Sequence, residues 1–304
     1  MKTGNVAAEA VQKRPFSSPL TIATFNLYNL FAVPEYGDLG TKLAKLTLAI
    51  QVEMLLPDIL LVQEVASEAL LGQLATAVNA GSACVYQAVA PPSSDRRGIR
   101  VGLLWNTARV QLQEAWQLQG ADVSAAFGAD SFNPGREPLA GLFTWDEQPL
   151  LILANHFKSD YVPPAQEEER DHLRRKFEAQ RLAQARVVRN FVDDWLARDP
   201  QALLLVGGDL NAEPTDLAVR FVAGHPPQIP LVNLLPTLRP GVHTFMRDGQ
   251  PAILDHLLAS PALRARCVDV VVPHFNTGQA DGLTAVSTTA RRSSDHDPLL
   301  AHFR

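Results

Sequence analysis

The stretch "RRSSDHDPLLAHF", residues 291–303, places Asp295, His296 and Asp297 directly before a proline and a final apolar run. A histidine between two aspartates says little alone, because short acidic turns occur by chance in many proteins. The apolar run predicts a buried strand, so the triplet lies at the edge of a sheet. Its meaning depends on whether other strands bring comparable polar groups to the same place.

Strand-like and helix-like segments alternate from "LTIATFN" (residues 20–26) to "PLLAHF" (residues 298–303). Helices are expected over residues 41–57, 68–80 and 165–200, where apolar residues recur at helical spacing. No repeat or linker interrupts the alternation. The sequence therefore predicts one layered α/β domain over residues 20–304, after a disordered N-terminal tail of residues 1–19.

Polar side chains recur at the ends of the predicted strands. In layered α/β folds, ligand sites are built at such strand ends. Asp255 lies inside the apolar run "AILDHLLAS", and a buried carboxylate is strongly unfavourable unless it is paired. Each residue alone also fits a turn or a solvated loop, but their recurrence predicts a shared site. The other strand-end residues are Asn26 in "ATFN", Glu64 in "LLVQEV", Asn155 and His156 in "LILANH", and Asp209 and Asn211 in "LLVGGDLN".

These residue types fit the hydrolysis of a phosphate ester. Carboxylate and amide oxygens without thiolates favour a hard divalent cation, Mg²⁺ first and Mn²⁺ or Ca²⁺ as relatives. Such an ion polarises a phosphoryl oxygen. Neighbouring histidines can donate hydrogen bonds or accept a proton from water. Arg100 and Arg136 are candidates for a bidentate phosphate clamp.

The order of motifs resembles the endonuclease/exonuclease/phosphatase superfamily, the fold of deoxyribonuclease I, from Leu20 to Phe303. The resemblance implies a four-layered α/β sandwich in which two mixed β-sheets pack face to face with helices outside. "NHFKS" resembles the bacterial extracellular-nuclease-like branch. The motifs are "FNLYNLF", "LLVQEV", "GIRVGLLW", "GREPLAGLF", "LILANHFKS", "VGGDLNAEP", "LDHLLAS" and "SSDHDPLL".

The resemblance also implies roles for single residues. Asp209 would orient or deprotonate the attacking water, and Asp255 would fix the tautomer of His296. Exonuclease III-type enzymes carry an aspartate where this chain has Tyr28, which disfavours a repair-type abasic endonuclease. Asp297 is expected to serve a turn or cap. The full expected set is Asn26, Glu64 and Asp295 for the metal; Arg100, Arg136 and Asn155 for the substrate phosphate; and His156, Asp209, Asn211, Asp255 and His296 for catalysis.

Charge and composition bear on the substrate. The chain has 304 residues, 46% of them hydrophobic, and a net charge of −5, which argues against a protein that coats nucleic acid nonspecifically. Local basic segments nevertheless favour nucleic acid as the substrate. A phospholipid or small phosphoester is the alternative, and a catalytically silent binding module is a third reading. A solvated helix face also explains the basic residues of the predicted long helix. These are Arg170, Arg174, Arg175, Lys176, Arg181, Arg186 and Arg189, and a loop adds Arg96 and Arg97.

The remaining features predict a soluble monomer without an obligate protein partner. The two cysteines, Cys84 and Cys267, lie far apart and are read as free thiols. No apolar run approaches the roughly 18 residues of a membrane span. The N-terminus shows no apolar core of a signal peptide, so no stable membrane insertion is expected. The compartment stays open.

Overall fold

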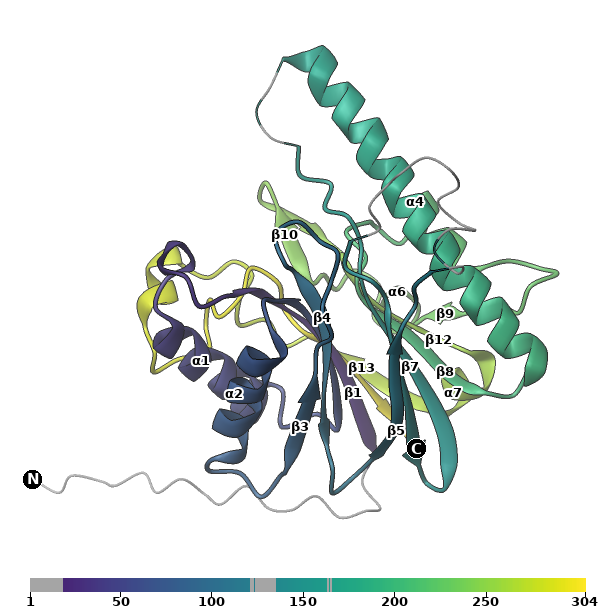
Figure 1. The fold of residues 1–304 in the computed structure, drawn as a ribbon, viewed down its shortest axis with the longest axis horizontal. Coiled ribbons are helices and arrows are strands. Elements are labelled where there is room, and N and C mark those ends of the chain that lie inside the picture. The colour runs from purple at the N-terminus through teal and green to yellow at the C-terminus, as the bar shows by residue number, and fades with distance from the viewer. Residues whose placement is uncertain (1–18, 121–122, 124–134, 163, 165) are drawn as a thin grey trace, which may run out of the picture.

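The structure, a computed structural model, describes residues 19–120, 123, 135–162, 164 and 166–304. Two six-stranded mixed sheets pack face to face, and helices cover their outer faces (Figure 1). The four-layered α/β sandwich expected from the sequence is therefore confirmed. The N-terminal tail expected over residues 1–19 lies, apart from its last residue, outside the described residues.

The first sheet is built around the first strand of the chain. β1 (Leu20–Leu30) runs parallel to β2 (Ile59–Val65) and antiparallel to the C-terminal strand β14 (Leu299–Phe303). The final apolar run thus returns to the start of the chain and brings residues 295–297 beside the end of β1. The full order is β13 (Cys267–Val271), β14, β1, β2, β4 (Arg100–Asn106) and β3 (Tyr86–Val89).

The second sheet has β7 (Gln148–His156) and β8 (Leu203–Asp209) side by side and parallel. β12 (Asp255–Ala259) pairs antiparallel with β8. The order is β5 (Gln111–Gln117), β6 (Leu139–Trp145), β7, β8, β12 and β9 (Val232–Asn233). A separate hairpin joins β10 (Phe245–Arg247) to β11 (Gln250–Ala252).

Helices lie on both outer faces. α1 (Leu39–Leu48) and α2 (Glu68–Asn79) pack on the first sheet, and α4 (Glu167–Arg198) and α5 (Leu217–Ala223) pack on the second. The N-terminal turns of α4 project beyond the sheets (Figure 1). Where one helix was expected over residues 41–57, the chain changes to a π-helical turn, Ala49–Glu53. Shorter elements are α6 (Leu234–Leu238), α7 (Pro261–Arg266) and the 3-10 turns η1 (Pro34–Tyr36) and η3 (Asp281–Ala285).

The strands are apolar because both of their faces are buried. Successive side chains alternate between the two faces of a strand. Ile22 and Leu61 point into the core between the sheets, while Phe25 and Leu60 pack against the outer helices. All four are fully buried. The sequence of such a strand is a continuous hydrophobic run. Within the part of the chain that the structure describes, no helix is long and apolar enough to cross a membrane.

Candidate active site

The two sheets bring their polar strand ends together in one place. In the second sheet, Asp209 pairs in register with both His156 and Asp255. Asn26 comes from β1 of the first sheet, and its Nδ2 donates to Asp209 Oδ2 at 3.0 Å and to Glu64 Oε1 at 3.5 Å. Residues separated by up to 183 positions in sequence thus form one buried hydrogen-bonded group.

The glycines of "GGDLN" make this geometry possible. Gly208 has φ +135°, and a Cβ there would lie 2.0 Å from the backbone oxygen of Asn155. Only glycine permits this approach. Beyond the strand, Asn211 takes a left-handed conformation, with φ +49°. Its backbone N–H donates to Asp209 Oδ1 at 2.9 Å, and its Nδ2 donates to the carbonyl of Phe157 at 3.1 Å. The turn therefore fixes the carboxylate of Asp209.

His296 and Asp255 form a buried pair. Nδ1 of His296 lies 2.7 Å from Asp255 Oδ2, and its Nε2 lies 3.8 Å from Asp209 Oδ2. Burial lowers the pKa of His296, but Asp255 and then Asp209 outweigh burial and raise the pKa well above its ordinary value. The ring of Phe245 lies 4.7 Å from the imidazole, between centroids. Asp255 therefore orients the imidazole of His296 and favours its protonated form.

Asp209 is poised to exchange a proton near neutrality. Burial raises its pKa to about 7; the charge of His296 opposes this rise and that of Asp255 adds to it. A carboxyl group with a pKa near the working pH is suited to general base catalysis. The same buried centre thus holds a carboxyl group with a pKa near neutrality and an imidazole that faces it.

His156 stays neutral beside an arginine. Burial, followed by the charge of Arg136, holds the pKa of His156 well below its ordinary value. Nη1 of Arg136 lies 2.8 Å from His156 Nε2. Because a guanidinium only donates, Nε2 accepts, and the ring carries its proton on Nδ1. Arg136 also donates to the carbonyl of Phe157 and to Asp95, at 2.8 and 3.2 Å, which fixes its position.

The residues expected to hold a metal lie at the ends of β1, β2 and the last loop. Glu64 has φ +63°, and its Oε2 accepts the backbone N–H of Asn29 at 2.9 Å. The hydroxyl of Ser294 donates to the carbonyl of Asn26 at 2.7 Å, which holds the Asp295 segment against β1. The charges of Glu64 and Asp295 both act on Tyr28, so the two carboxylates share one neighbourhood.

This donor set fits a hard divalent cation. Its donors are carboxylate and amide oxygens, the ligand type that Mg²⁺, Mn²⁺ and Ca²⁺ prefer. Oδ1 of Asp255 is buried and has no hydrogen-bond partner among the residues that the structure describes. Ligand atoms of Asp209, Asp255 and His296 also lie within 4.8 Å of one another. The hydrogen bond between His296 and Asp255 and the charge that both aspartates exert on His296 fit a proton-transfer group better, so we propose Asn26, Glu64 and Asp295 as the ligand set.

Two residues expected at the substrate phosphate do not join this group. Arg100 donates from Nη1 to the carbonyl of Ala90 at 2.9 Å. Asn155 is fully buried, and its Nδ2 donates to the carbonyls of Leu153 and Gly207 at 2.8 and 3.3 Å. Neighbouring side chains of a strand point to opposite faces, so placing His156 in the site turns Asn155 away. In the structure both side chains thus bond to backbone carbonyls, and their assignment to the substrate phosphate stays a prediction.

Asp297, expected at a turn or cap, anchors a loop. Its Oδ1 accepts the backbone N–H groups of Phe275, Asn276 and Thr277 at 3.1, 2.8 and 3.3 Å. Its Oδ2 accepts from His274 Nδ1 at 2.8 Å. Asp297 thereby ties the loop that follows β13 to the segment that carries His296.

Three basic residues lie near the site; Arg97 and Arg181 belong to the basic segments noted in the sequence, whereas Lys158 had no assigned role. Lys158, in "NHFKS", and Arg181 of α4 lie side by side, and Arg181 donates to the carbonyl of Lys158 at 3.3 Å. Arg97 donates to Asn29 Oδ1 at 2.8 Å. Lys158, Arg136 and Arg97 all lower the pKa of His156. We call Arg97, Lys158 and Arg181 the basic rim; the sequence indicated Arg97 and Arg181 through their basic segments, and the strand-end motif "NHFKS" could have indicated Lys158.

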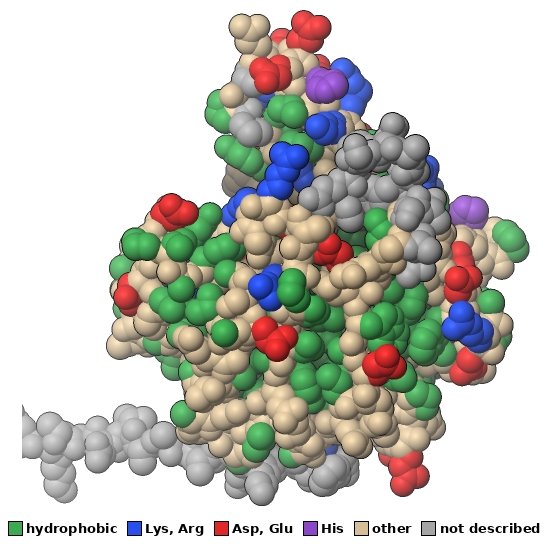
Figure 2. Space-filling view, viewed as in Figure 1, with side chains coloured by type: hydrophobic (Ala, Val, Ile, Leu, Met, Phe, Trp, Pro, Cys, Tyr) green, Lys and Arg blue, Asp and Glu red, His purple; other side chains and the backbone are tan. Residues whose placement is uncertain are grey.

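The projecting half of α4 adds exposed basic residues to the basic rim, whereas the rest of the helix also carries a buried arginine. Arg174, Arg175 and Lys176 are exposed on the projecting half of α4. Figure 2 shows Lys and Arg side chains along this projection and down toward the centre of the molecule. Arg189, by contrast, is buried and ion-paired with Asp193. The predicted basic face therefore includes a residue of the core.

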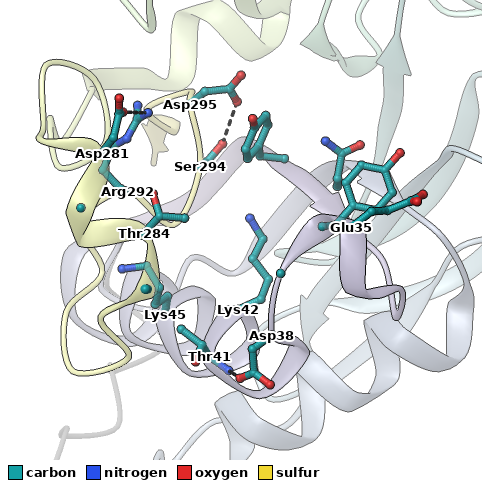
Figure 3. A pocket seen from close by; sticks show the side chains of 16 residues that line it. Glu35, Asp38, Thr41, Lys42, Lys45, Asp281, Thr284, Arg292, Ser294 and Asp295 are labelled. Atoms are coloured by element: carbon teal, nitrogen blue, oxygen red, sulfur yellow. Dashed lines mark hydrogen bonds and ion pairs between the residues drawn. The ribbon is translucent and has the colours of Figure 1, made fainter.

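A cavity of about 610 Å³ adjoins the metal-side residues. It is lined by the end of β1, by η1, by the start of α1 and by residues 281–295 (Figure 3). Asp295 forms part of its wall, so the cavity opens beside the group just described. Sequence patterns had placed its residue Lys42 on an ordinary helix.

Comparisons with known proteins agree with this architecture. A human Nocturnin catalytic domain with bound sulfate matches with a TM-score of 0.62 and 17% identity, covering 94% of each chain. A humanized D. rerio TDP2 with 14 mutations matches with a TM-score of 0.62 and 18% identity, covering 95% of this chain and 100% of that chain.

A mannosyl-6-phosphatase of Bacteroides thetaiotaomicron VPI-5482 matches with a TM-score of 0.62 and 16% identity, covering 93% of this chain and 98% of that chain. No curated protein matches the sequence. The sequence of residues 23–296 matches the Endonuclease/Exonuclease/phosphatase family. The chain therefore belongs to the Endonuclease/Exonuclease/phosphatase family, whose members hydrolyse phosphoric esters.

Proposed function

We propose that this chain is a divalent-metal-dependent phosphodiesterase that cleaves nucleic acid by direct attack of water on phosphorus. The observation that carries the proposal is the convergence of His156, Asp209, Asp255 and His296 in one buried group beside Asn26. Because "NHFKS" resembles the motif of the bacterial extracellular-nuclease-like branch, we propose that the chain is related to that branch of the family.

The reacting groups take complementary roles. With a pKa of about 7, Asp209 accepts the proton of the attacking water. The imidazolium of His296 donates from Nε2 to a non-bridging oxygen and offsets the charge that grows there. Asp255 holds the imidazole in that orientation through Nδ1. No covalent enzyme intermediate is needed, since water attacks phosphorus and the ester oxygen leaves.

Two further sets of residues support this chemistry, one for the metal and one for the phosphate. Asn26, Glu64 and Asp295 would hold Mg²⁺, with Mn²⁺ or Ca²⁺ as relatives, and the ion would supply Lewis-acid polarisation of a phosphoryl oxygen. Arg136 would bind the same phosphate from the other side through its guanidinium, and the neutral imidazole of His156, whose Nε2 accepts from Arg136, would hold that guanidinium in place. Asn211 holds the turn that positions Asp209.

The basic rim supports nucleic acid as the substrate. A nuclease needs cations that follow a phosphate backbone beyond the scissile bond. Arg97, Lys158 and Arg181 lie around the site, and exposed basic residues of α4 extend that surface. A D. rerio TDP2 of the same fold was solved with a single-strand DNA product, at 18% identity, a TM-score of 0.62 and coverage of 95% of this chain and 100% of that chain. Such a likeness gives the fold alone, so the substrate class depends on the rim.

A substrate screen tests the proposal. Supercoiled plasmid, single-stranded DNA, RNA, sphingomyelin, a sugar phosphate and bis-p-nitrophenyl phosphate are each incubated with the protein, in Mg²⁺ or in EDTA. We expect Mg²⁺-dependent cleavage of nucleic acid. Turnover of only the lipid or the sugar phosphate would replace the nuclease assignment. No turnover of any substrate would indicate a catalytically silent binding module.

A further inference from the structure

The cavity beside Asp295 has aromatic side chains in its wall and adjoins the candidate active site. It encloses about 610 Å³, within the range of small-ligand pockets. Tyr28 and Tyr36 line it, and they are 47% and 37% exposed. Exposed aromatic faces beside a phosphate-cleaving group are suited to stacking on a flat ring. The cavity therefore has room and surface for one unit of a substrate.

Several charged groups of the cavity wall are already occupied. Arg292 is paired with Asp281. Asp38 caps α1 by accepting the N–H of Thr41 at 2.7 Å. The ammonium group of Lys45 donates to four backbone carbonyls, those of Leu283, Val286, Thr289 and Arg291. These groups fix the loop over residues 283–291 and shape the wall.

Lys42 differs from these groups. Its ammonium donates to the carbonyl of Ser293 at 2.6 Å and lies 5.3 Å from the centre of the Tyr28 ring. An ammonium has three donors, so Lys42 keeps donors for a ligand. It also lies near the charges of Asp295 and Glu64. The cavity thus offers aromatic rings together with a cation, and Figure 3 shows Lys42 among the side chains that line it.

The bound unit would sit on the metal side of the phosphate. His156 lies at Asp209, to which Asn26 donates, whereas Asn29, Tyr28 and Asp295 border the cavity. Asn29 connects the two regions, because its backbone donates to Glu64 and its Oδ1 accepts from Arg97. Arg97 of the basic rim thus contacts the cavity wall directly, through Asn29.

Resting on the proposed function, we propose that this cavity is a nucleoside subsite, which takes the unit on the metal side of the scissile phosphate. Tyr28 and Tyr36 supply stacking surface for the base, and Lys42 donates to the sugar or the adjoining phosphate oxygen. A base must leave a duplex stack to enter such a pocket, which is unfavourable. The enzyme therefore prefers single strands or frayed ends to intact duplex.

Binding is measured with a single-stranded oligonucleotide that carries 2-aminopurine. The protein carries His296→Ala, so that the oligonucleotide is not consumed, and Mg²⁺ is present. Stacking quenches the fluorescence of the probe. Adding Tyr36→Ala should weaken binding about 5-fold or more, the scale of one lost base–aromatic contact. Phe221→Ala is the matched control, because Phe221 is a similarly exposed aromatic residue of α5, at 39%.

A kinetic ratio separates this inference from the proposed function. We compare kcat/KM on single-stranded DNA with kcat/KM on bis-p-nitrophenyl phosphate, which has no nucleoside. The ratio should fall about tenfold in Tyr36→Ala and in Lys42→Met, with no change in Phe221→Ala. If the wild type cleaves nucleic acid but neither variant changes the ratio, the subsite is rejected and the nuclease stands.

Two other outcomes also overturn the subsite. Wild-type protein that cleaves no nucleic acid removes the nuclease and the subsite together. A Tyr36→Ala defect that is confined to sugar-phosphate turnover would assign the cavity to a sugar. Faster cleavage of a single strand than of the same sequence in duplex form, lost in Tyr36→Ala, supports the proposal.

Discussion

Nδ1 of His296 lies 2.7 Å from Oδ2 of Asp255, and both side chains are buried. The two residues are 41 positions apart in sequence and come from the final loop and from β12. The Asp255 carboxylate accepts from Nδ1, so Nε2 is left to face Asp209. The pair explains why an aspartate occurs in the apolar run "AILDHLLAS".

Asp255→Asn should show whether catalysis depends on the charge of Asp255 or only on the packing of its side chain. The amide keeps the size of the side chain but removes the charge that stabilises the imidazolium. We expect kcat to fall at least ~10²-fold, the scale of a lost acid/base group, with little change in KM. Asp269→Asn is the control, because Asp269 pairs with Arg239 on the surface. Wild-type kcat in Asp255→Asn would contradict the pairing as a catalytic device.

Asp209→Ala should abolish the proton acceptor. We expect turnover to fall at least ~10²-fold, while circular dichroism shows a retained fold. His225→Ala, at an exposed histidine, should leave turnover unchanged. Asp209→Ala with normal turnover on every substrate would exclude Asp209 as the general base.

Glu64→Gln should weaken the binding of the divalent cation. The substitution keeps the oxygen donor but removes one negative charge of the expected ligand set. We expect a higher Mg²⁺ concentration for half-maximal activity and a smaller rise in melting temperature on adding Mg²⁺, since a ligand of the native state stabilises it. Glu53→Gln, at an exposed residue, is the control. An unchanged Mg²⁺ dependence by both measurements would place the ion elsewhere.

Gly208→Ala should destabilise the fold and the site together. The new Cβ would lie 2.0 Å from the carbonyl oxygen of Asn155, and φ is +135°. We expect a loss of at least ~3 kcal/mol in the free energy of unfolding, measured by urea denaturation. Gly72→Ala is the matched control: Gly72 lies in α2 with nothing near its Cβ position. That control should gain about 0.5–1 kcal/mol. A neutral Gly208→Ala would show that the strand end is arranged differently.

Lys158 should make nucleic-acid cleavage sensitive to alkaline pH. Burial, with Arg136 and Arg181, lowers its pKa to about 8, and its ammonium lies 3.8 Å from the centre of the Phe177 ring. Lys158 is therefore cationic below that pH and neutral above it. We expect kcat/KM on DNA to fall as the pH rises through about 8. In Lys158→Arg this part of the fall should disappear, because a guanidinium stays charged. Identical profiles for wild type and Lys158→Arg would remove Lys158 from substrate binding.

The sequence predicted most of the fold because the strands are long apolar runs with distinct boundaries. "DILLVQEV" became β2, and "PLLILANH" became β7, within a residue or so of the predicted ends. The short helices α5, α6 and α7 were missed, since five to seven residues hold too little periodic signal. The helix expected over residues 41–57 was too long, because α1 ends at Leu48 and a π-helical turn follows.

The sequence also determined which residue types stand at the strand ends, and hence the kind of chemistry to expect. Register and strand direction are tertiary properties, so only the folded chain could join His156, Asp209 and Asp255 in one row. Side-chain direction follows from the alternation of a strand, which turned Asn155 into the sheet while His156 faced the site. The cavity of Tyr28 and Lys42 also needed the fold, because its walls come from segments more than 200 residues apart that share no local pattern.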